Sequence, residues 1–153
     1  MKITPDEETH YLKKVTLFQN LKPLELKIIS LCMEQVIFKT GDIIVSEGDE
    51  GDETFIIYSG RVEVYRKLAD ETFASLNVLG PGEMFGEMAL FGDGFRTASV
   101  KAIQETIVGV ITKEKLYDIV REFPDIAIEI LKVQTRRFSK MENRLMECLK
   151  NGK

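Results

Sequence analysis

Residues 85–100 have the sequence FGEMALFGDGFRTASV, which places a turn glycine, an acid, a short apolar run and a single arginine in one folded-back segment. Gly86 lets the backbone approach a ligand closely and is expected to start a short helix, whose free amides and dipole favour an anion. Glu87 can accept hydrogen bonds from ribose hydroxyls, and Arg96 supplies a planar fork of donors that matches two phosphate oxygens. The segment therefore predicts a site for a sugar-linked phosphate.

The chain around this segment is expected to form short β-strands. From residue 34 to residue 112, runs of β-branched and aromatic residues are separated by turns that contain glycine. The expected strands are 36–38, 43–45, 54–58, 62–65, 73–79 and 107–111. Many short strands with such turns predict a sandwich or barrel rather than a βαβ sheet.

Helices are expected on both sides of the β-region. Thr4 can cap a first helix that has Pro5 at its first position, and a second helix is expected to start near Lys22 and Pro23. The apolar residues expected on one buried face of the second helix are Leu24, Ile28, Ile29 and Leu31. Beyond the β-region, helical periodicity returns over 113–122 and then over a long run from Pro124 to about residue 149.

The last helix carries the spacing of a heptad seam. Its seam positions step by three and four residues: Leu131, Gln134, Phe138, Met141, Leu145 and Cys148. That spacing predicts a helix that packs against a partner.

Composition limits the classes of function. The chain has 153 residues, 44% hydrophobic residues and a net charge of -4, which favours one compact domain with no general attraction to nucleic acid or anionic membranes. No segment approaches the roughly 20 apolar residues that a membrane span needs, so we expect a cytoplasmic protein with no membrane insertion. Cys32 and Cys148 lie far apart and form neither a CxxC motif nor a disulfide framework.

The segment from Gly86 to Val100 resembles the cyclic nucleotide-binding domain family, which includes catabolite-activator-type regulators, regulatory subunits of cyclic-AMP-dependent protein kinase and cyclic-nucleotide-gated channels. The resemblance covers about residues 12–145. It includes turn glycines at Gly41, Gly48, Gly60 and Gly82.

The resemblance implies a mostly β fold with flanking helices, a double-stranded β-helix (jelly-roll) barrel with N-terminal helices and a long C-terminal helix. Its expected parts are an N-terminal helical segment (1–32), a β-roll core (33–112) with a phosphate-binding cassette (85–100), and C-terminal helices (113–153) that act as hinge, lid and dimer helix.

The resemblance also implies roles within the cassette. Amides near Gly86 and Ala89, together with Arg96, should hold the cyclic phosphate, and Glu87 should accept from the ribose 2′-hydroxyl. The expected binding residues are Gly86, Glu87, Met88, Ala89, Arg96, Thr97 and Ala98. The apolar run 88–91 is expected to anchor the cassette in the core. One alternative stays open, in which Glu87 and Arg96 form an exposed salt bridge with each other.

Two positions in the cassette bear on geometry and base preference. Phe95 stands where relatives often carry proline, so the approach to Arg96 is expected to be less rigid. Thr97 stands where cyclic-GMP-responsive relatives use a threonine that is associated with contact to the guanine 2-amino group. It can equally serve the phosphate alone, as serine does in bacterial relatives. Cyclic AMP is therefore the expected ligand, and cyclic GMP is the alternative.

In the family, the lid over the base comes from the long C-terminal helix of the same subunit or its partner. The candidates for the lid are Leu131, Gln134, Thr135 and Phe138, which equally suit dimer packing. We expect a homodimer through this helix and a downstream protein effector of unknown identity. We expect no direct DNA binding, because no helix-turn-helix follows the dimer helix.

Three other classes of protein compete with a cyclic nucleotide sensor. A cupin-like metalloenzyme needs two or more strand histidines, whereas the chain has only His10, outside the expected strands. No nucleophile motif is present either, so we expect no enzyme and no metal. A transcription factor needs the recognition helix that is missing here. A degenerate domain that serves only as a protein-interaction module is the remaining alternative, and the presence of both Glu87 and Arg96 argues against it.

Overall fold

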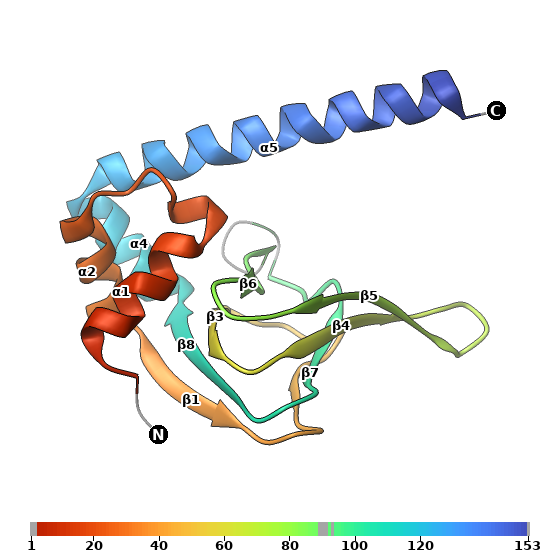
Figure 1. Cartoon of the computed structure of the whole chain (residues 1–153), viewed down its shortest axis with the longest axis horizontal. Coiled ribbons are helices and arrows are strands. Elements are labelled where there is room, and N and C mark those ends of the chain that lie inside the picture. The colour runs from red at the N-terminus through yellow and green to blue at the C-terminus, as the bar shows by residue number, and fades with distance from the viewer. Residues whose placement is uncertain (1–2, 89–91, 93, 153) are drawn as a thin grey trace.

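The computed structural model of the chain describes residues 3–88, 92 and 94–152. Two four-stranded antiparallel sheets form its centre, and helices from both ends of the chain pack together beside them (Figure 1). One sheet has the strand order β1-β8-β3-β6 and the other β2-β7-β4-β5. The strands are β1 (Glu34–Phe38), β2 (Ile43–Val45), β3 (Glu53–Ser59), β4 (Val62–Lys67), β5 (Phe73–Leu79), β6 (Met84–Phe85), β7 (Ser99–Ala102) and β8 (Thr106–Thr112). The expected jelly-roll fold with flanking helices and a long C-terminal helix is confirmed.

Strand β3 is buried on both faces, which explains its unbroken apolar run. Phe55 and Ile57 point into the core between the two sheets, whereas Ile56 and Tyr58 point into a second core beneath the helices. The inter-sheet core consists of Val45, Phe55, Ile57, Val62, Phe85, Val100, Val108 and Val110. A strand covered on both sides loses the alternating pattern of a half-exposed strand.

The second core joins helices from both ends of the chain. Among its buried residues are Leu12, Leu17, Phe18, Ile29, Tyr58, Ile111, Leu116, Ile126, Ile130 and Val133. Because the N-terminal and C-terminal helices pack in this one core, a displacement of the N-terminal helices would change the packing of the C-terminal helices.

The N-terminal helices are α1 (Pro5–Lys14), the short 3₁₀ helix η1 (Thr16–Phe18) and α2 (Pro23–Leu31). The expected cap is confirmed, since Thr4 Oγ1 accepts a hydrogen bond from the Glu7 amide at 3.3 Å.

The expected face of α2 is wrong in part. Ile29 is buried, but Leu24 and Leu31 are exposed, and Leu26 is buried in their place. The apolar residues of α2 form two stripes. The stripe with Leu26 and Ile29 is buried in the second core, whereas on the other stripe only Ile28 packs against that core, and it is partly buried.

The strands β6 and β7 were not predicted as separate elements. β6 has only two residues, and β7 has the sequence SVKA, whose polar residues obscure the strand pattern. Both strands frame the cassette, because β6 pairs with β3 before it and β7 pairs with β2 and β4 after it. The cassette therefore connects the two sheets.

The C-terminal helices are α4 (Lys113–Glu122) and α5 (Pro124–Asn151). Thr112 caps α4 by accepting from the Lys115 amide at 3.2 Å. Helix α5 leaves the helical cluster and runs over the sheets as one long helix (Figure 1). Its buried residues are Ile126, Ile130 and Val133, all in its first ten positions. None of the described helices has the length and apolar character that a membrane span requires.

Candidate functional site

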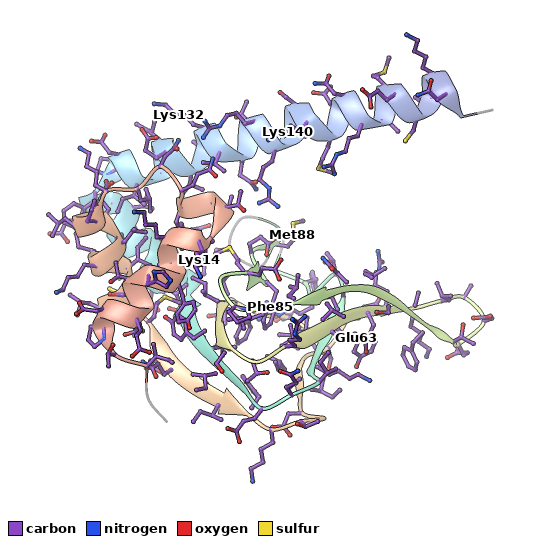
Figure 2. The ribbon with its side chains drawn as sticks, in the orientation of Figure 1. Lys14, Glu63, Phe85, Met88, Lys132 and Lys140 are labelled. Carbon is purple, nitrogen blue, oxygen red and sulfur yellow. The ribbon has the colours of Figure 1, made fainter. Side chains whose placement is uncertain are left out.

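A cavity of about 310 Å³ lies between the cassette and the inner face of the β2-β7-β4-β5 sheet. It is lined by Val45, Val64, Asn77, Leu79, Met84, Phe85, Gly86, Glu87, Met88, Phe95, Arg96, Thr97, Ala98, Val100 and Arg137. Six of the seven residues expected to bind therefore line one cavity, and the seventh, Ala89, lies outside the described residues. Figure 2 shows Met88 on the side of the sheets that faces α5.

Arg96 is the cation of this cavity, and only 9% of it is exposed. Its Nη1 donates to the Glu53 carbonyl at 2.9 Å, and its guanidinium lies 5.7 Å from the centre of the Phe55 ring. Burial lowers the pKa of Arg96, while the nearby carboxylates of Glu53 and Asp52 raise it. None of the ion pairs between described residues includes Arg96. Glu87 and Arg96 therefore do not form a salt bridge with each other among the described residues. The guanidinium still has N–H donors available for an anion.

Two glycines allow the guanidinium to sit where it does. A Cβ at Gly51 would lie 2.3 Å from Arg96 Nε, and a Cβ at Gly86 would lie 2.9 Å from Arg96 Nη1. Gly86 also has a φ of +81°, a backbone conformation that residues with a side chain rarely adopt. Gly86 is thus required both for the turn and for the close approach to Arg96.

The backbone of Arg96 is hydrogen-bonded to the turn at residues 48–51. The Arg96 amide donates to the Asp49 carbonyl at 2.8 Å, and its carbonyl accepts from the Gly48 amide at 2.8 Å. Phe95 itself forms a β-bridge with Glu50. Backbone contacts therefore join residues 95 and 96 to the 48–51 turn, and the expected effect of Phe95 on rigidity stays a prediction.

The acid and the remaining candidates lie around the rim of the cavity. Glu87 is half-buried, Ala98 is half-buried and Thr97 is exposed. Met88 is 55% exposed, so its expected role as a core anchor is wrong, although it does line the cavity. The other residues of the apolar run, 89–91, lie outside the described residues.

A second cavity, of about 420 Å³, adjoins the first. The two share Asn77, Leu79, Met84, Glu87 and Arg137. The N-terminal residues that line the second cavity are Lys14, Val15, Thr16 and Leu17. Glu87 therefore lies between a cavity walled by the β-sheet and one walled by the end of α1.

The contribution of α5 differs from the expected lid. In the described part of the chain, the α5 residue that lines both cavities is Arg137, and none of Leu131, Gln134, Thr135 and Phe138 lines either of them. Arg137 Nη1 donates to Gln134 Oε1 at 3.4 Å. A sequence signal existed, because Arg137 continues the spacing of the buried residues Ile130 and Val133 along the helix.

The chemistry of the cavity is that of a binding site. The described residues contain no group of three or more His, Cys, Asp and Glu side chains that could hold a metal ion. The cavity instead brings together a buried guanidinium, a carboxylate and apolar walls from both sheets. That combination suits an anion joined to a polar ring and a flat base.

Comparison with known proteins agrees with this geometry. The chain is 30% identical over 138 residues to a CRP-like cAMP-activated global transcriptional regulator of Mycobacterium tuberculosis, a match that covers 90% of this chain and 62% of that protein. It is 36% identical over 107 residues to the cGMP-dependent protein kinase egl-4 of Caenorhabditis elegans, which covers 69% of this chain and 14% of the kinase. The chain thus spans less than two thirds of the length of these relatives.

Among solved structures, the N-terminal domain of a transcriptional regulator from Streptomyces coelicolor matches with a TM-score of 0.81 and 29% identity, covering 88% of this chain and 93% of that one. The family model for the cyclic nucleotide-binding domain matches residues 35–123, which include every described strand after β1 and the whole cassette. The chain belongs to the cyclic nucleotide-binding domain family.

Proposed function

We propose that this chain binds a cyclic nucleotide as a regulatory sensor and carries out no catalytic step. The observation that carries the proposal is Arg96, a buried guanidinium that faces the same cavity as Glu87 and forms no ion pair with a described residue. The carboxylates of Glu53 and Asp52 act on this cation without forming an ion pair with it, and a bound phosphate would supply a direct counter-charge. The family to which the chain belongs supports the cyclic form of that phosphate.

In this proposal different residues of the cassette bind different parts of the ligand. Arg96 and the amides near Gly86 and Ala89 hold the cyclic phosphate, because guanidinium and backbone N–H groups are strong donors to phosphate oxygens. Glu87 accepts from the ribose 2′-hydroxyl. Met88, Thr97 and Ala98 complete the wall around the ligand.

Cyclic AMP is the proposed ligand, and cyclic GMP is the alternative. The Mycobacterium relative is named as cAMP-activated, whereas the nematode relative is named as a cGMP-dependent kinase. Similarity alone therefore does not choose between cyclic AMP and cyclic GMP. Thr97 lines the cavity, where its hydroxyl can serve the phosphate or a guanine amino group.

The proposed output is a movement of α5. The β-roll unit (33–112) captures the ligand, and the C-terminal helices (113–153) respond through Arg137, which reaches the cavity from α5. The exposed seam of α5 is proposed to pair with a second copy of the chain, and an effector protein reads the change. That the chain alone does not bind DNA stays a prediction, which gel-shift assays with nucleotide present can test.

Calorimetric titration with cyclic AMP and cyclic GMP tests the proposal. Arg96→Ala should weaken binding by about two decades or more, since removal of one partner of a desolvated charge pair costs roughly 2–5 kcal/mol. Arg121→Ala is the matched control, because Arg121 is an exposed arginine of α4 that pairs with Asp118. Unchanged affinity in Arg96→Ala would sink the site assignment. If neither nucleotide binds the wild type, the protein-interaction module becomes the better reading.

A further inference from the structure

A buried acid lies outside the nucleotide cavity, in helix α1. Glu8 is 8% exposed, and its Oε2 accepts a hydrogen bond at 3.0 Å from the hydroxyl of Tyr58, which is completely buried. The Gln35 side chain forms a second hydrogen bond with the Glu8 carboxylate. Gln35 also holds the backbone of Ile3, donating to its carbonyl at 2.6 Å and accepting from its amide at 2.8 Å. The start of the chain is therefore attached to β1 and β3 by polar contacts.

Among residues 3–88, 92 and 94–152, the side chains that form hydrogen bonds with Glu8 are Tyr58 of β3 and Gln35 of β1, and both are neutral. From β8, Gly109 leaves room for the tyrosine, since a Cβ there would lie 2.3 Å from the Tyr58 hydroxyl oxygen. On α1 itself, the neighbouring titratable residues Glu7 and His10 are exposed. A buried carboxylate with only neutral partners is costly to ionise, and burial accordingly raises the pKa of Glu8.

This acid is connected to the nucleotide cavity through two short paths. Beside Tyr58 in β3, the Ile57 amide donates to the Glu83 carbonyl at 2.9 Å, and the Ile57 carbonyl accepts from the Gly82 amide at 2.8 Å. At the other end of α1, Lys14 packs on the same turn so closely that a Cβ at Gly82 would lie 2.9 Å from Lys14 Cβ. That turn leads directly into the cassette.

We propose that the Glu8–Tyr58 contact is a proton-dependent latch that seats α1 against β3 and, through Lys14 and Gly82, adjusts the affinity of the nucleotide cavity. The coupling to affinity rests on the proposed function, whereas the latch itself does not. With Glu8 protonated, α1 is fully seated, and the wall that residues 14–17 form beside Glu87 is fixed. With Glu8 ionised, the buried charge loosens that seat.

The direction of the pH dependence follows from the raised pKa of Glu8. The folded state keeps this proton to a higher pH than the unfolded chain does, where the ordinary value is 4.5. Burial of the protonated Glu8 side chain therefore contributes stability that is complete below that ordinary value and is lost as the pH rises through the raised pKa, although the hydrogen bond from Tyr58 by itself favours the carboxylate. Nucleotide binding that seats α1 more firmly should accordingly strengthen at lower pH.

The test compares wild type with Glu8→Gln, whose neutral amide still accepts from Tyr58, and with Glu7→Gln as an exposed control. Amide hydrogen-exchange protection factors of α1 are measured without ligand between about pH 5 and pH 8, and cyclic AMP affinity is measured over the same range. Wild type and Glu7→Gln should lose α1 protection as the pH rises. Their affinity should fall by about threefold as the pH rises, because a larger share of the free protein then carries an ionised Glu8 and a loosened α1. Glu8→Gln should be flat in both measurements.

The outcomes separate the two proposals. Equal α1 protection profiles in wild type and Glu8→Gln would overturn the latch, whether or not nucleotide binds. A difference in protection with identical affinity profiles would overturn the coupling to the cavity. An absence of cyclic nucleotide binding at every pH would contradict the proposed function and the coupling, while the protection profiles would still judge the latch.

Discussion

Helix α5 carries two stripes one residue apart, and they differ in what covers them. One stripe, Ile126, Ile130 and Val133, is buried in the core that the helices share, and its next position along the helix is Arg137. The other stripe begins at Leu131 and continues through Phe138, Met141 and Leu145, all of which are exposed. The inward stripe thus changes from apolar to cationic where the helix reaches the cavities, whereas the outward stripe is apolar except at Gln134.

The difference between the stripes shows which side chains of α5 are covered by the rest of this chain and which are not. The inward stripe has its neighbours within the fold. The outward stripe is an unusually long row of exposed apolar side chains at heptad spacing, which is typical of a helix that pairs with another helix. Substitutions in the two stripes should therefore affect different properties: stability for the inward stripe and self-association for the outward stripe.

The largest effect is expected in the inward stripe. Ile126→Ala should lower the free energy of unfolding by about 2–5 kcal/mol, because the side chain is completely buried and leaves a cavity. Ile128→Ala is the control two positions along the same helix, where the side chain is half exposed, and should cost about 0.5 kcal/mol or less. Chemical denaturation measures both. Similar losses in the two variants would show that the inward stripe is not what attaches α5 to the fold.

A smaller effect is expected in the outward stripe, and on a different property. Leu145→Lys should weaken self-association by about 2 kcal/mol, or roughly 30-fold, because a charge replaces an apolar seam residue. Met146→Lys changes an equally exposed neighbour that lies off the seam and should leave association unchanged. Sedimentation equilibrium measures the dissociation constant, and circular dichroism checks that the helix persists. A wild type that is monomeric at every concentration would contradict the proposed homodimer.

The sequence predicted those parts of the fold that repeat a simple pattern. The long strands, the caps of the helices and the heptad spacing are all local signals, and the structure agrees with them at Thr4, along β3 and along α5. The strands β6 and β7 were not predicted because they are short. They form by pairing with strands that are distant in sequence. The buried face of α2 was predicted wrongly in part because its apolar residues are on two stripes. Only tertiary packing decides which stripe is buried.

The site shows the same division between local and distant information. Six candidate residues fall within one short segment, so the sequence alone could group them. Arg137 is 41 positions beyond Arg96 and belongs to another element, so the pattern of the cassette segment does not point to it. The role of Gly51 was also missed, since the close approach of Arg96 to it depends on a turn that is distant in sequence.

The smallest effect is expected at Arg137, where the inward stripe meets the cavities. Arg137→Ala should weaken cyclic nucleotide binding by about 0.2–1 kcal/mol, because the side chain is exposed to solvent and its attraction to a bound anion or to Glu87 is screened. Arg136→Ala is the control, since Arg136 has the same charge on the same helix but does not line either cavity. Calorimetry at low and high salt measures both variants, and the Arg137 effect should shrink as salt rises. Equal effects of the two substitutions would mean that α5 acts on the ligand through its general positive charge, and that the inward stripe has no special access to the site.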